Sequence, residues 1–311
     1  MTAAFTLSLD CEGLWGMADQ SRVVSGGVIN QVSLRQTYDF IAQTLDEHDL
    51  RCTAAFVTGF AAGPELMREH IQSIHELARM VPWWFTNILP AIERVATDGW
   101  DGHSFFKRFA QGGHEMAWHG TTHLPLEDST PEEAIQLELQ LGRALLSRLD
   151  CKPTSIVFPR NRVGHLGMLK KAGFTTYRAD RGRNKLLKLT ELAREWHIFD
   201  QRVAEKPHRN GDWMVLPPGD FLNWPCRIRA GIPPAVTVMR WKSLLRAAVA
   251  HGGYVHMWFH PHNLITTSAM KDSFAAIIRE VAQLVRSGEI VVLTMKDAEQ
   301  HFANRCTGAV A

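Results

Sequence analysis

Short apolar runs alternate with longer amphipathic stretches along most of the 311 residues, and this alternation limits the possible folds more than any other feature. The short runs have the length of strands, and the longer stretches repeat their apolar residues at helical spacing. The predicted strands cover 5–10, 52–58, 114–119, 155–159, 174–177, 213–216, 254–260 and 290–294, and the longest predicted helices cover 33–48, 131–149, 241–250 and 270–287. Strands separated by helices pair in parallel through βαβ units. Seven or eight such units predict an α/β protein built as a barrel.

Two regions break this alternation. Residues 63–112 contain three prolines and a Trp-Trp-Phe cluster between short helical pieces, so we expect a helical insertion there. Residues 180–212 show neither the strand period nor the helix period clearly, and we expect an irregular insertion. The alternation continues on both sides of each region. The sequence therefore predicts a single domain over residues 1–311.

The composition excludes several classes of protein. A net charge of +2, with 45% hydrophobic and 21% charged residues, is ordinary for a globular protein and gives no reason to expect a nucleic-acid partner. The chain has no stretch of about 18 apolar residues and does not begin with a basic and apolar leader. Its five cysteines are odd in number and widely scattered, which favours unpaired thiols in a reducing compartment. We therefore expect a cytoplasmic protein.

Two acids and two histidines have the spacing of a metal site. Asp10 and Glu12 follow the first predicted strand, and side chains two residues apart on a strand point to the same side. His119 and His123 are four residues apart and can face one cation. A zinc-protease helix is excluded because His114 and His119 are five residues apart, and five steps of about 100° place the two rings on different helix faces. The pattern indicates a hydrolytic metal site.

The chemistry-bearing residues also share a position in the predicted fold. Asp10, His119, Arg160 and His260 each fall at or just beyond the carboxyl end of a predicted strand. In a (β/α) barrel the active site lies at that end of the strands. The sequence therefore predicts that these four side chains meet.

On these residues the chain resembles the polysaccharide deacetylase family, also called the NodB-homology or carbohydrate esterase family 4. The stretches that carry the resemblance are residues 10–12, 113–123, 158–162 and 255–262, of which 113–123 is the most specific. The resemblance implies a distorted (β/α)7-type barrel with helical insertions. It also implies a divalent metal ion, for which Zn²⁺ is our first expectation, held by one acid and two histidines.

The resemblance assigns roles to individual residues. It implies that Glu12, His119 and His123 bind the metal, that Asp10 is the catalytic base and that His260 is the general acid. An arginine after the fourth strand would orient the base. We expect that residue to be Arg160, although the local order of residues leaves Arg162 as an alternative.

Three further side chains are candidates for binding the substrate. Trp15 follows Glu12 closely in the sequence, and Trp258 lies in the strand that leads to His260. His262 shares a strand face with Trp258 and His260. Aromatic faces suit sugar rings. For each tryptophan the alternative is an ordinary core residue, and for His262 it is an exposed loop residue.

These assignments predict a hydrolase that removes an N-acyl group, most simply acetyl, from an amino sugar in a surface-polysaccharide or glycolipid precursor. An N-deformylase of a formamido sugar on a lipid or nucleotide carrier is an alternative. A lipid-phosphate carrier would bring the protein to the inner face of a membrane as a peripheral contact. From another class, the chain could be a catalytically silent carbohydrate-binding barrel.

Overall fold

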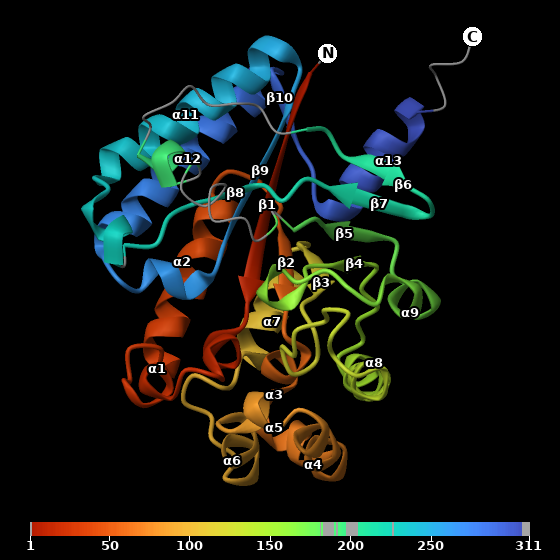
Figure 1. The fold of residues 1–311 in the computed structure, drawn as a ribbon. Helices are drawn as coiled ribbons and strands as arrows, with labels where there is room; N and C mark the ends of the chain where they lie inside the picture. The colour runs from red at the N-terminus through yellow and green to blue at the C-terminus, as the bar shows by residue number, and fades with distance from the viewer. Residues whose placement is uncertain are drawn as a thin grey trace.

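The computed structural model describes residues 2–180, 182, 190, 192–196, 205–225 and 227–306. Within these ranges ten strands form one sheet, in the order β6-β7-β5-β4-β3-β2-β1-β9-β8, with β10 also paired to β1 (Figure 1). Every pair is parallel except β6 with β7. The strands are β1 (Ala3–Cys11), β2 (Thr53–Phe56), β3 (Glu115–Trp118), β4 (Ser155–Ile156), β5 (Thr176–Arg178), β6 (His208–Asn210), β7 (Trp213–Leu216), β8 (Asp220–Phe221), β9 (Tyr254–Phe259) and β10 (Ile290–Val292).

Strand β1 is the centre of the sheet. It pairs with β9 along one edge and with both β10 and β2 along the other, and it is buried over its whole length. Its odd-numbered residues from Phe5 to Cys11 belong to the large core beneath the helices. Its even-numbered residues, ending in Ser8 and Asp10, face the concave side, because side chains alternate along a strand.

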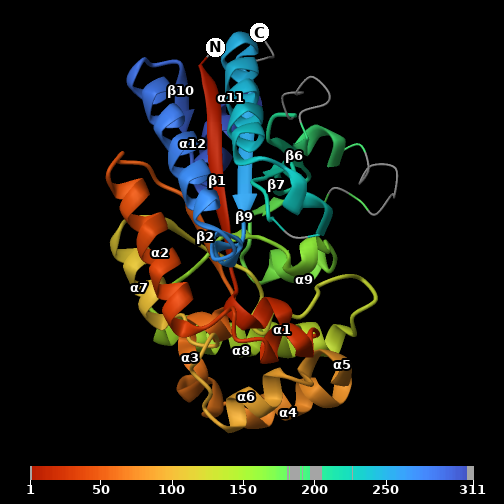
Figure 2. The same cartoon turned by 90° about the vertical axis from the view of Figure 1, so that its left-hand side faces the viewer.

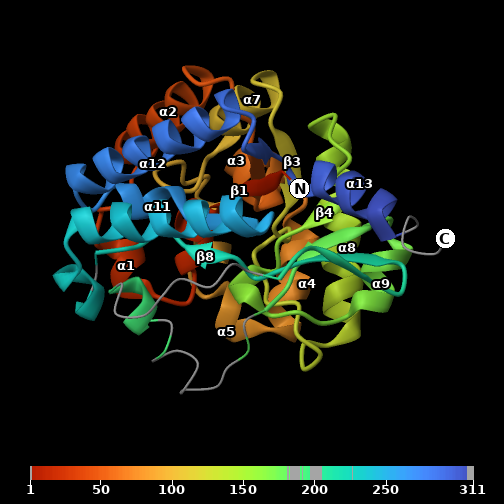
Figure 3. The same cartoon turned by 90° about the horizontal axis from the view of Figure 1, so that it is seen from above.

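Helices cover the convex side of the sheet. Figure 3 shows α2, α11 and α12 side by side on one flank, and Figures 1 and 2 show α4, α5 and α6 grouped beyond the carboxyl end of β1. The α-helices are α1 (Ser21–Ser25), α2 (Gln31–Asp46), α3 (Thr58–Arg68), α4 (Ile71–Met80), α5 (Pro82–Phe85), α6 (Ile88–Glu93), α7 (His103–Gln111), α8 (Glu132–Arg148), α9 (Leu166–Lys171), α11 (Pro234–His251), α12 (Ser268–Arg286) and α13 (Met295–Cys306). The described part of the chain also has four 3₁₀ turns: η1 (Gly13–Met17), η2 (Pro159–Asn161), η3 (Arg227–Gly231) and η4 (Pro261–Leu264).

A second core fills the concave side near the start of the strands. It combines small strand residues such as Ala4, Ala55 and Ala117 with Met295 and Phe302 of α13. Helix α13 contacts β1, β5, β6 and β7, and so it closes this end of the sheet (Figure 1). The opposite end, where the parallel strands finish, is the end that carries the candidate site.

The predicted fold class is confirmed: the chain is an α/β protein with a curled parallel sheet of the distorted (β/α)7 type. The eight predicted strands are all present, and the expected helical insertion at 63–112 contains α4, α5 and α6. The short strands β6 and β8 and helix α13 were not predicted. Most of the expected irregular insertion at 180–212 lies outside the described residues.

No helix in the described part of the chain is both long and apolar enough to cross a membrane. Cys11, Cys52 and Cys151 are free thiols, as the scattered cysteines predicted.

Candidate metal centre and active site

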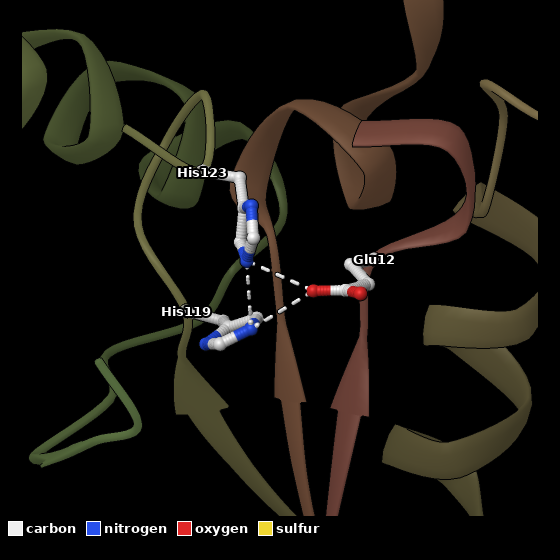
Figure 4. Close-up of side chains that lie close together, drawn as sticks. All are labelled: Glu12, His119 and His123. Carbon is white, nitrogen blue, oxygen red and sulfur yellow. Dashed lines mark hydrogen bonds and ion pairs between the residues drawn. The ribbon is translucent and has the colours of Figure 1, made fainter. Parts of the chain in front are cut away.

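Glu12, His119 and His123 bring three ligand atoms together at the carboxyl end of the sheet (Figure 4). Glu12 Oε2 lies 2.8 Å from His123 Nε2 and 3.3 Å from His119 Nε2, and the two Nε2 atoms are 3.2 Å apart. All three side chains are buried. One carboxylate and two imidazoles are a donor set that zinc accepts, with coordination positions left for water and substrate. The residues therefore fit the divalent metal that the fold family implies.

The ring of His119 is held in the orientation that a metal ligand needs. Its Nδ1 donates a hydrogen bond to the carbonyl oxygen of Val157 at 2.7 Å, which leaves the lone pair on Nε2 for a cation. Burial lowers the pKa of His123 to about 4, although Glu12 partly opposes this shift. His123 is therefore neutral near pH 7, as a ligand must be.

The turn from His119 to His123 is shaped by left-handed backbone. Gly120 has φ of 77° and His123 has φ of 60°. A Cβ on Gly120 would lie only 2.9 Å from Cγ of Pro159, so this position needs glycine for space as well as for conformation. Two backbone N–H groups at the start of α3, those of Thr58 and Gly59, donate to carbonyl oxygens of this turn.

Glu138 anchors the same turn from helix α8. Its Oε2 accepts hydrogen bonds from the N–H groups of Thr121 and Thr122 at 2.9 and 3.1 Å, and its Oε1 accepts one from the Thr122 hydroxyl. Burial raises the pKa of Glu138 to about 7, an effect that these hydrogen bonds only partly offset. Gly142, one turn further along α8, leaves room for the Thr121 side chain, since a Cβ there would lie 2.4 Å from Thr121 Oγ1.

Asp10 is paired with Arg178 on the concave side. Arg178 donates from two nitrogens to the two carboxylate oxygens of Asp10, at 2.9 and 2.7 Å, and both side chains are buried. The guanidinium also donates to Ser8 and Asn161 and lies 4.5 Å from the ring centre of Trp258. Burial alone would raise the pKa of Asp10, but the Arg178 charge, with His119 in support, brings that pKa below its usual value. Asp10 is therefore a carboxylate.

His260 lies beside both acids, immediately after β9. Its Nε2 is 3.5 Å from Glu12 Oε1 and 3.9 Å from Asp10 Oδ2. Its Nδ1 donates to the side-chain oxygen of Asn263 at 3.3 Å, which directs Nε2 toward the acids. The His260 side chain is 24% exposed, against 2% for each acid, so a group arriving from solvent meets His260 first.

In the structure the arginine paired with Asp10 is Arg178 and not Arg160. Arg160 has a left-handed backbone, with φ of 59°, and its guanidinium contacts Asp19 and the Gly16 carbonyl oxygen instead. The alternative, Arg162, pairs with Glu127. The expectation for Arg160 was wrong because the chain turns sharply after Pro159 and carries that side chain away from Asp10.

The three expected substrate-binding residues lie in different surroundings. Trp15 is fully buried, donates to the Trp100 carbonyl oxygen and packs edge-on against the Trp100 ring, so it has no free face for a sugar. This corrects the expectation for Trp15. The residue lies in η1, and this 3₁₀ turn directs its side chain into the core. Trp258 is half-buried, with Arg178 over its ring. His262 is buried, and its ring stacks on that of His260.

Two important residues were missed in the sequence, although each left a signal. Arg178 ends a strand at the same edge of the sheet as Asp10, but the predicted strand stopped at residue 177. Glu138 falls on the buried face of its helix, in register with Ile135, Leu141 and Leu145. An acid in an apolar helical stripe requires hydrogen-bond donors, which the turn from His119 to His123 supplies.

No protein-family model matches the sequence, and no curated protein matches it. Solved structures do match over nearly the whole chain. Two of these structures are described as candidate polysaccharide deacetylases, one from Mycobacterium smegmatis and one from Pseudomonas aeruginosa PAO1. The first has a TM-score of 0.60 at 16% identity, over 98% of this chain and 91% of its own. The second has a TM-score of 0.60 at 11% identity, over 97% and 91%.

This chain has the polysaccharide deacetylase fold. The resemblance found in the sequence motifs is therefore confirmed for the fold. The allantoinase PuuE is also similar, with a TM-score of 0.55 at 12% identity, over 96% of this chain and 89% of that chain. Since the deacetylase fold is shared with a protein named for a different reaction, the activity must be argued from the site.

We predict that Glu138→Ala weakens both the fold and the metal centre. Loss of the carboxylate leaves two buried N–H groups unsatisfied, at about 1–3 kcal/mol each. Partners of this kind that orient metal ligands typically contribute about 10- to 100-fold to metal affinity. Urea denaturation and zinc titration measure the two effects. Glu138→Gln, which keeps an acceptor oxygen, should lose much less, and equal losses in both variants would contradict this role.

We predict that Gly16→Ala removes Glu12 from the metal centre without unfolding the protein. A Cβ at this position would lie 2.0 Å from Glu12 Oε1, and a flexible carboxylate can swing away where backbone could not. Zinc affinity should fall by about tenfold or more, while the unfolding midpoint changes little. Gly167→Ala is the matched control, because a Cβ there meets nothing within 4 Å. Unchanged zinc affinity in Gly16→Ala would contradict the placement of Glu12.

Proposed function

We propose that this protein is a metal-dependent hydrolase that removes an N-acyl group, with acetyl as the first choice, from an amino sugar. The observation that carries the proposal is the grouping of Glu12, His119 and His123 within a few ångströms of a paired carboxylate and a histidine. The fold neighbours with candidate deacetylase activity support the same reaction class.

The chain's own residues supply the proton transfers. A divalent cation bound by Glu12, His119 and His123, for which zinc fits the donor set, would polarise the amide carbonyl and lower the pKa of a water. Asp10, held as a carboxylate by Arg178, takes a proton from the attacking water. His260 gives a proton to the amine nitrogen as the C–N bond breaks. The products are a carboxylic acid and a free amino sugar.

The carbohydrate part of the proposal rests on the side chains beside the two acids. His260 is partly exposed beside the two acids, and the half-buried Trp258 packs edge-on against its ring and offers an aromatic surface for a sugar. We propose that the amino sugar belongs to a surface-polysaccharide or glycolipid precursor. We further propose that a lipid phosphate carries this precursor, which would bring the protein into contact with the inner face of the membrane. The free thiols suit a cytoplasmic protein, since reducing compartments keep cysteines unpaired.

Acyl release with and without metal is the direct test. Protein stripped by a chelator should release neither acetate nor formate from a panel of N-acetylated and N-formylated amino sugars, and one equivalent of zinc should restore release. Asp10→Asn should keep zinc binding and lower kcat by about 10²- to 10⁴-fold, the usual contribution of a positioned base. Formate without acetate would change the acyl assignment to formyl. Zinc binding without any acyl release would favour a carbohydrate-binding barrel.

We predict that Arg178→Met shifts the pH profile of kcat/KM. A base must be deprotonated, and Arg178 lowers the pKa of Asp10, so its removal raises that pKa and moves the acidic limb to higher pH. An adjacent arginine typically lowers an aspartate pKa by about 1–3 units, which sets the size of the shift. Arg178→Lys should move the limb less. Arg148→Met, at an exposed ion pair with Glu69, is the control. An unmoved limb in Arg178→Met would exclude Asp10 as the base.

A further inference from the structure

The second oxygen of Glu12 faces a second group of histidines. While Oε2 contacts His119 and His123, Oε1 lies 3.5 Å from His260 Nε2. The ligand atoms of Glu12, His260 and His262 all lie within 4.8 Å of one another. Glu12 thus stands between two pairs of imidazoles, with one carboxylate oxygen toward the first pair and one toward the second.

The second pair is held rigidly. Pro261 begins η4 directly after His260, and Asn263 accepts hydrogen bonds from both the backbone N–H and Nδ1 of His260. The rings of His260 and His262 are stacked, with centroids 5.0 Å apart and planes 19° apart. Trp224 packs edge-on against the ring of His262. The two imidazoles therefore keep a fixed separation.

His262 has a nitrogen whose hydrogen-bonding capacity is unused. The residue is 3% exposed, and its Nε2 has no hydrogen-bond partner within the described ranges of the chain. Buried polar atoms nearly always have a partner, so an unpartnered nitrogen on an imidazole that is grouped with Glu12 and His260 requires an explanation. A cation bound by that nitrogen would supply one.

We propose that Glu12, His260 and His262 form a second divalent-cation site, with Glu12 bridging it to the first. Carboxylates commonly bridge paired metal ions, which lie about 3.5–4 Å apart in two-metal enzymes. The second site is the weaker one, because Arg178 neutralises Asp10 and leaves Glu12 as the carboxylate that both cations share. It therefore fills only after the first.

Filling the second site inhibits the enzyme. This consequence depends on the proposed function, in which His260 Nε2 carries the proton for the departing amine. A cation on that nitrogen occupies its lone pair, so that the nitrogen holds no proton to give. Activity should therefore rise with the first equivalent of metal and fall with the second, by about 10²-fold at saturation if general acid catalysis is lost.

Metal stoichiometry tests the site without reference to activity. Chelator-stripped protein is titrated with zinc by calorimetry, and bound metal is measured by elemental analysis. The wild type should bind two equivalents, the second more weakly, and His262→Ala should bind one. His251→Ala is the matched control, since His251 is an exposed histidine at the other end of β9, and it should bind two. Far-UV circular dichroism verifies the fold of each variant.

The outcomes separate this inference from the proposed function. A single equivalent in the wild type, or two in a folded His262→Ala, overturns the second site and leaves the deacylase proposal standing. No bound zinc at all overturns both. The wild type also gives an answer without any variant: anomalous diffraction at the zinc edge should show two peaks flanking Glu12, and one peak near His119 and His123 would overturn the inference.

Discussion

The buried pair of Asp10 and Arg178 is the interaction on which the site depends. Two carboxylates, those of Asp10 and Glu12, lie beside each other with almost no solvent, and like charges in such surroundings would normally force one of them to take up a proton. The two-pronged contact from Arg178 compensates the charge of Asp10, while imidazoles surround Glu12. Each acid thus has its own cationic or metal partner. In the proposed mechanism, this separation lets Asp10 act as the base while Glu12 binds the cation.

The sheet brings the site residues together, and contacts from the helices fix their conformation. Parallel strands bring Asp10, His119, Arg178 and His260 to one edge of the sheet, although these residues are far apart in the sequence. The strand ends do not by themselves fix the turn that carries His123, which needs a left-handed backbone and the carboxylate of Glu138 beneath it. Burying the Glu138 carboxylate in helix α8 is unfavourable, but the buried carboxylate holds the turn from His119 to His123 in one conformation, as residues that support functional sites commonly do.

Sequence reasoning succeeded where period and spacing decide the outcome. The alternation of strands and helices predicted the sheet, and the spacing of Asp10 with Glu12 and of His119 with His123 predicted which residues converge. The predictions were wrong where the path of a loop determines the direction of a side chain. The direction of the chain after Pro159 separates Arg160 from Asp10, and η1 buries Trp15, and neither depends on a periodic pattern. Arg178 was missed because a strand boundary was placed one residue early, which shows how much one position matters at a sheet edge.

The central claim is that Glu12, His119 and His123 hold a divalent cation with coordination positions open to solvent. X-ray absorption spectroscopy at the zinc edge, on protein loaded with a single equivalent, tests it most directly. The account predicts two imidazole nitrogens at about 2.0–2.1 Å and further oxygen scatterers at similar distance, one from a carboxylate and the rest from solvent. A sulfur scatterer near 2.3 Å, or a first shell without imidazole, would contradict it.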